Sequence, residues 1–151
     1  PGRTQDTSMK VMVIVKASPD TEAGVMPTEA ELAAMGNFNE QLVNAGIMLA
    51  GEGLQPSHRG HRVVYGGASP RVIDGPFAET RELIAGFWLW QVRSMDEALE
   101  WAKRAPFAPN DVVELRPLFD MDDFGEAFTP ELRAQEQRLR DQMEQHDGET
   151  R

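Results

Sequence analysis

Apolar residues along this chain fall into short runs separated by glycine, proline and aspartate, a pattern typical of strands. The run Lys10–Lys16 is apolar at both alternating positions, which favours a central strand covered on two sides. Gly66 and Gly67 are expected to join two short strands. Pro117 favours a sheet edge or a strand end, because proline cannot donate to a strand ladder. The predicted strands cover residues 10–16, 47–54, 60–65, 71–73, 86–92 and 112–118.

Two helices are predicted between these strands from their capping patterns. Thr28 and Glu31 match the capping box, in which each side chain bonds the backbone N–H of the other residue. Ser94 and Glu97 repeat the same spacing. Gly46 stands where a left-handed residue commonly follows a helix. The apolar face of the first helix is formed by Leu32, Met35, Phe38 and Leu42.

The order of elements is strand, helix, strand, then a hairpin, then strand, helix, strand. This order indicates an α+β fold, a ferredoxin-like split βαβ sandwich with two helices on one face of an antiparallel sheet. Valine and tryptophan occur on both alternations of the strands, so the other face of the sheet also needs a cover. A second copy of the chain is the expected cover, and we predict a homodimer.

The chain divides into three parts. Residues 1–8 are polar, carry no apolar leader segment and are expected to be disordered. Residues 9–119 form the folded domain, and residues 120–151 form an acidic C-terminal extension with one helix. That helix opens at Thr129, which is followed by a proline, and residues 147–151 are expected to be disordered. Its thin apolar stripe, expected to lie on the surface or against a partner, is Leu132, Leu139 and Met143.

Charge and composition exclude several classes of function. The net charge is −10, and residues 120–151 contribute −6 of it, from ten acidic residues and four arginines. No basic stripe offsets this charge, so direct binding of nucleic acid is not expected. The chain has no cysteine, which excludes disulfides and thiolate chemistry and fits a cytoplasmic protein. The apolar runs are too short to span a membrane.

Residues 72–89, which read VIDGPFAETRELIAGFWL, resemble the signature of the DGPF proteins, a branch of the YCII-related family. Residues 50–56 and 96–102 are similar to two further motifs of that family, in the same order. The resemblance covers residues 9–119 and implies a ferredoxin-like chain that pairs into a dimeric α+β barrel. It implies little about activity. Some relatives act on small organic molecules through an acidic residue, sometimes assisted by histidine, and DGPF proteins are often found beside extracytoplasmic-function sigma factors.

Acidic residues near this signature are the first candidates for chemistry. Asp74 sits at a tight turn, where a partly desolvated carboxylate can act as an acid or base; alternatively it only caps the turn. Glu79 could join it as a paired carboxylate, and Arg81 could hold an anionic substrate. Alternatively, Glu79 and Glu82 belong to a solvated helical turn. Glu52 lies between two glycines. These glycines would allow a ligand to approach the backbone closely, or alternatively they indicate a β-bulge with Glu52 turned to water.

The remaining candidates are ligand-binding residues. His58 and His61 are too loosely spaced to predict a metal site, and two exposed loop histidines are favoured, with a His–Asp pair left in doubt. Phe77 and other aromatic residues could line an apolar pocket around Asp74, although core packing accounts for most of them. No phosphate-binding loop or other cofactor motif is present, and no cofactor or metal is predicted.

Two functional hypotheses follow. The first is a small-molecule enzyme or binder with a cleft near Asp74, which we expect at the mouth of a pocket with Glu52 or Glu79 as its nearest acidic neighbour. The second is a non-catalytic interaction or regulatory module for a sigma factor of the extracytoplasmic-function type.

Overall fold

The secondary structure alternates strands with helices through most of the chain. A computed structural model describes residues 8–149. The strands are β1 (Met9–Lys16), β2 (Met48–Gly53), β3 (His61–Val64), β4 (Arg71–Asp74), β5 (Ile84–Val92) and β6 (Val113–Pro117). The helices are α1 (Pro19–Glu22), α2 (Glu29–Asn44), α3 (Met95–Lys103) and α4 (Pro130–Glu149). Short 3₁₀ helices are η1 (Ser57–Arg59), η2 (Thr80–Glu82) and η3 (Met121–Ala127).

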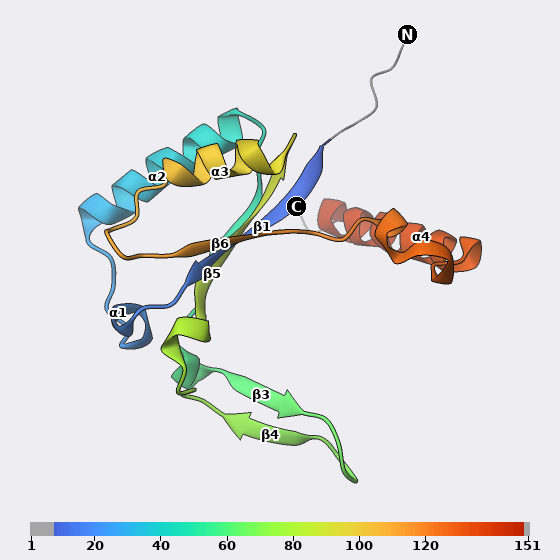
Figure 1. Cartoon of the computed structure of the whole chain (residues 1–151), viewed down its shortest axis with the longest axis horizontal. Helices are drawn as coiled ribbons and strands as arrows, with labels where there is room; N and C mark the ends of the chain where they lie inside the picture. Colours follow the sequence, from blue (N-terminus) through green and yellow to red (C-terminus); the bar gives the residue numbers. More distant parts are fainter. Residues whose placement is uncertain (1–7, 150–151) are drawn as a thin grey trace. The chain divides into compact units, whose positions relative to one another are not determined.

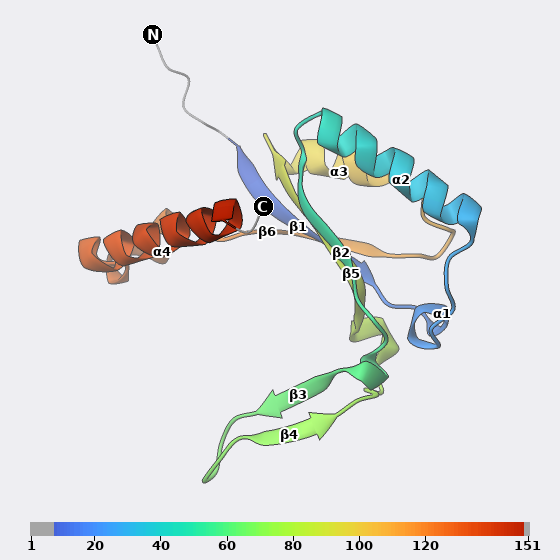
Figure 2. The ribbon, with the colours of Figure 1, turned by 180° about the vertical axis from the view of Figure 1, so that it is seen from behind.

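Four of the strands form one antiparallel sheet in the order β2-β5-β1-β6. Strand β1 is central, as its apolar sequence predicts, and Pro117 ends the edge strand β6. Helices α2 and α3 lie side by side over one face of this sheet (Figures 1 and 2). The arrangement is the ferredoxin-like α+β fold predicted from the order of elements.

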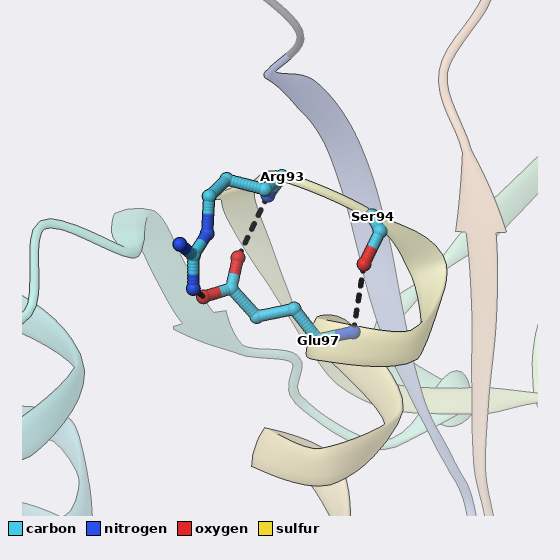
Figure 3. Close-up of polar contacts among 3 residues, drawn as sticks. All are labelled: Arg93, Ser94 and Glu97. Atoms are coloured by element: carbon cyan, nitrogen blue, oxygen red, sulfur yellow. Dashed lines mark hydrogen bonds and ion pairs between the residues drawn. The ribbon is translucent and has the colours of Figure 1, made fainter.

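The caps of α2 match the sequence, whereas the cap of α3 differs in one contact. Thr28 and Glu31 form the reciprocal capping box at the start of α2. At α3, the Ser94 hydroxyl accepts the Glu97 N–H at 3.1 Å, but the Glu97 carboxylate accepts the backbone N–H of Arg93 at 2.7 Å (Figure 3). The Arg93 guanidinium bonds the second oxygen of this carboxylate at 3.1 Å. The bond from the Arg93 backbone is the main reason that the pKa of Glu97 lies below its usual range.

The core lies between the sheet and these two helices. Trp88 and Trp90 of β5 point toward the helices and contact the ring of Phe38 in α2 edge-on, at 5.7 and 6.4 Å between ring centroids. Because residues two apart on a strand share a face, the two tryptophans lie on the same covered face, and the prediction that tryptophan occupies both faces is wrong. The other buried residues of the core are Val11, Val13, Leu42, Ile47, Val92 and Ala98.

The other face of the sheet carries no helix of this domain (Figure 2). At its centre, Met12 pairs with Leu89 and Ile14 pairs with Phe87 across β1 and β5, and all four side chains are only partly buried. Charged and polar side chains surround this apolar centre. They are Lys10, Lys16, Glu52, Gln91, Glu114 and Arg116, placed on the same face by the strand register. We call this surface the open face.

Strands β3 and β4 form a separate two-stranded sheet (Figure 1). Gly66 and Gly67, both with positive φ, lie in the connection between them, as the sequence predicts. A Cβ atom would strain both positions, which is why glycine occupies them.

The described residues after Leu118, 119–149, form a second compact unit. Within it, η3 precedes α4. The ring of Phe124 contacts the rings of both Phe119 and Phe128. Helix α4 continues to Glu149, so the expected disorder of residues 147–149 is not observed, while residues 1–7 and 150–151 lie outside the described part. No helix within residues 8–149 has the length and apolar character needed to cross a membrane.

Candidate functional site

The Asp-Gly-Pro-Phe turn, residues 74–77, packs its backbone directly against η1. A Cβ atom on Gly75 would lie 1.8 Å from the carbonyl oxygen of Ser57, so only glycine fits at this position. The Gly75 N–H donates to the carbonyl of Gly60 at 2.9 Å. The glycine of the signature is therefore required by a close contact between two backbone segments, not by a positive φ.

Ser57 connects this turn to the first helix. Its hydroxyl accepts the Phe77 N–H at 3.1 Å and donates to the carboxylate of Glu22, which also accepts the Ser57 N–H at 2.9 Å. These bonds hold the pKa of Glu22 below its usual range, with the Ser57 hydroxyl as the largest cause. Helix α1 was not among the predicted elements, so this Glu22–Ser57 contact was not anticipated.

His61 and Asp74 are brought together by the register of the hairpin. They face each other as the first residue of β3 and the last residue of β4, and His61 Nδ1 lies 2.8 Å from Asp74 Oδ1. Their side chains are 64% and 79% exposed. His61 is exposed, as expected, but it lies in a strand and not in a loop. The sequence predicted the hairpin but not its register. A two-residue turn at Gly66 and Gly67 would have paired His61 with Val72, whereas the observed ladder pairs Val64 with Arg71 and so His61 with Asp74.

Other predicted site residues lie apart from this pair. His58 is exposed in η1, and Glu79 is exposed at the start of η2. Glu52 is opposite Phe87 on the open face of the sheet, and it belongs to a regular strand pair without a bulge at this position. The side chain of Arg81 lies outside the described part of the chain. Within residues 8–149, no three histidine, aspartate or glutamate side chains gather as metal ligands.

A cavity of about 490 Å³ adjoins the signature turn and is lined by Ser57, Gly60, Phe77 and Glu22, among others. The guanidinium of Arg62 lies 3.9 Å from the centre of the Phe77 ring. Asp74 and His61 do not line this cavity, but Gly60 directly precedes His61 and bonds the residue after Asp74. The hydrogen-bonded pair is therefore next to a cavity but exposed, which differs from the expected position of Asp74 at a pocket mouth.

The sequence is similar to known proteins over most of the folded domain. A model of the YCII-related domain matches residues 9–122. An uncharacterized protein from Rhizobium meliloti (strain 1021) is 47% identical over 49 residues, which are 31% of this chain and 40% of the relative. The match thus spans less than half of that relative's length. The family match agrees with the resemblance drawn from the signature residues.

Replacement of Gly75 tests the close backbone contact. Gly75→Ala is expected to lower the free energy of unfolding by about 1–3 kcal/mol, because the Ser57 carbonyl must move to admit a methyl group. Urea unfolding followed by tryptophan fluorescence measures this change. The control is Gly36→Ala in α2, where the added methyl meets no neighbouring side chain and should stabilise the helix by about 1 kcal/mol. An unchanged stability of Gly75→Ala would contradict the contact.

The contact between Glu22 and Ser57 predicts a pH dependence of stability. Because the pKa of Glu22 is lowered in the folded state, its contribution is complete above the unfolded value of about 4.3 and is lost as the pH falls through the folded value. The melting temperature of Glu22→Gln should therefore lie below that of the wild type at pH 7 and converge with it in acid. In the Ser57→Ala background, Glu22→Gln should have a smaller effect, because only the bond from the backbone N–H of residue 57 remains. Additive effects of the two changes would argue against the contact.

Proposed function

This chain belongs to the YCII-related family, and we propose that it binds a small organic molecule beside His61 and Asp74 and moves a proton on it. The observation that carries the proposal is the 2.8 Å contact between the His61 ring and the Asp74 carboxylate. The adjoining cavity of about 490 Å³ is within the size range of small-molecule sites and supports it.

The chemistry of the pair follows from its donors and acceptors. An ionised carboxylate can only accept a hydrogen bond, so the atom facing Asp74 is His61 Nδ1–H. In the neutral ring this leaves Nε2 with a lone pair, as a base free to take a proton from a bound molecule. Asp74 holds the ring in this tautomer and orientation.

The rigid support of the signature turn is consistent with this role. Gly75 is bonded to Gly60, which directly precedes His61, and Phe77 is bonded to Ser57, four positions before His61. These bonds connect the two segments on one side of the pair, and the ladder of β3 and β4 connects them on the other side. Such connections limit the movement of His61 relative to Asp74, which general acid–base catalysis requires.

The exposure of the pair argues that a second copy of the chain completes the site. A catalytic base acts best where water is excluded, but both side chains are exposed in the single chain. The open face has an apolar centre and a charged rim, the composition of a protein interface. We therefore propose a homodimer that forms through the open face.

A second candidate is an interaction module for a sigma factor of the extracytoplasmic-function type. Its support is the stripe of exposed side chains on α4 within an acidic extension, formed by Leu132, Leu139 and Met143. If this function is correct, Leu139→Gln with Met143→Gln should abolish binding to such a factor in a pull-down. Asp74→Asn should leave this binding intact.

Variants of the pair test the proposed proton transfer. Native mass spectrometry of protein isolated from its own cells would first identify a bound molecule, which then serves as the substrate. His61→Gln and Asp74→Asn are each expected to lower turnover by about 10²- to 10⁴-fold. The melting temperature should change little, because an exposed pair contributes at most about 1 kcal/mol.

Glu79→Gln is the matched control, since it removes an exposed carboxylate of the same segment without touching the pair. It should retain the wild-type rate. If turnover instead survives both His61→Gln and Asp74→Asn, and only Asp74→Ala destabilises the fold, the pair serves the turn and not catalysis.

The homodimer has its own test. Light scattering at micromolar concentration should give about twice the mass of one chain. Leu89→Arg places a charge at the centre of the open face and should give monomers, because burying an unpaired charge is costly. Leu32→Arg should remain dimeric, because Leu32 is exposed in α2 and lies away from the open face. A monomeric wild type would exclude this interface.

A further inference from the structure

A second cavity, of about 590 Å³, lies between the covered face of the sheet and α2. The rings of Trp88 and Phe107, which meet edge-on at 5.9 Å, contribute to its wall, together with Met35 and Met48. The Trp88 indole N–H donates to Asn39 Oδ1 at 2.9 Å, which fixes the orientation of this ring. The cavity adjoins the smaller one described above, because Leu54, Gln55 and Pro56 line both.

Glycines create this space. Gly53 and Gly86 are paired across β2 and β5, and both point toward the covered face because Gly51, two residues before Gly53, is opposite Trp88. Gly86 is required there, since its Cβ would lie 2.8 Å from the carbonyl oxygen of Glu52. Gly51 is also required, because its Cβ would approach Met48 and Trp88 to 2.8 Å.

Gly53 differs from these two positions. A Cβ atom built on Gly53 meets no atom within 4 Å, and its φ is not in the left-handed region. Neither packing nor backbone conformation therefore demands glycine at this position. A glycine that leaves open space beside aromatic walls is typical of a place where a ligand approaches the backbone closely.

The side chains around the cavity indicate the charge of its ligand. Glu52 is the single charged residue among the described lining residues. Its position opposite Phe87 puts its carboxylate on the open face, away from Trp88. A charged ligand would lose its hydration in this cavity without gaining a counter-charge. Aromatic rings pack well against the edges of tryptophan and phenylalanine and against methionine sulfur.

We propose that this cavity is a binding site for a neutral, planar aromatic molecule, which lies against Trp88 in the space left by Gly53. The site is separate from the His61–Asp74 pair and does not depend on proton transfer there. Exposed Val25 and Met26, which lie in the loop before α2 and also line the cavity, contribute apolar surface on its outer side.

Two dyes with the same ring system test the proposal. N-phenyl-1-naphthylamine is neutral, and 8-anilinonaphthalene-1-sulfonate carries a sulfonate on the same rings. The wild-type chain should bind the neutral dye at one site per chain and at least about tenfold more tightly than the sulfonate, because the cavity offers no cation. Failure of the neutral dye to bind, or equal affinity for the two dyes, would overturn the proposal.

A cavity-filling variant locates the site. Gly53→Leu should weaken binding of the neutral dye at least about tenfold, because the new side chain occupies the open space. Ala50→Leu is the matched control, since it adds the same side chain to β2 but on the open face, opposite Leu89, and should retain binding. Wild-type affinity in Gly53→Leu would mean that the dye binds elsewhere, for example on the open face, and the proposal would be wrong.

If Gly53→Leu does not fold, a measurement on the wild-type protein can still locate the bound dye. In a ¹H–¹⁵N spectrum, addition of the neutral dye should shift the indole resonance of Trp88. The resonance of Trp101, which does not line the cavity, should stay in place. A shift of Trp101 without a shift of Trp88 would also overturn the proposal.

Discussion

Two helices can cover only one face of a four-stranded sheet, and this constraint organises the domain. The alternation of side chains along β1 and β5 assigns Val11, Val13, Trp88 and Trp90 to the helices and leaves the open face with an apolar centre. The same alternation puts the paired glycines of β2 and β5 on the covered face. That face therefore has both the buried core of the domain and, beside the glycines, a cavity.

The signature turn attaches the separate hairpin of β3 and β4 to this sheet. The contact of Gly75 with the Ser57 carbonyl and the bonds from Ser57 to Phe77 and Glu22 join three segments that are distant in the sequence. None of these bonds involves a reacting group. Their effect is to bring the start of β3 beside the end of β4, which places His61 next to Asp74. The structural role of the signature is thus carried by Gly75 and Phe77, which neighbour the residue for which we propose a chemical role, Asp74.

Local features of the sequence predicted most of the fold. The capping box at Thr28 and the turn at Gly66 depend on residues within a few positions of each other, and both are confirmed. Two other local features differ from the prediction. Ser94 caps α3 as expected, but Glu97 bonds Arg93 because the guanidinium and the backbone N–H of that residue attract the same carboxylate. Helix α1 was missed because its four residues are too few to show the periodic spacing of apolar residues that indicates a helix.

The sequence by itself determined the fold class, the central position of β1 and the family, because these follow from apolar alternation, caps and a continuous motif. Tertiary structure decided which of the candidate residues meet. Glu52 and Asp74 are both acidic and near glycines, yet strand register puts one on the open face and the other beside His61. The need for glycine at position 75 also became visible only in three dimensions, since the atom that excludes a Cβ belongs to Ser57, 18 positions earlier in the chain.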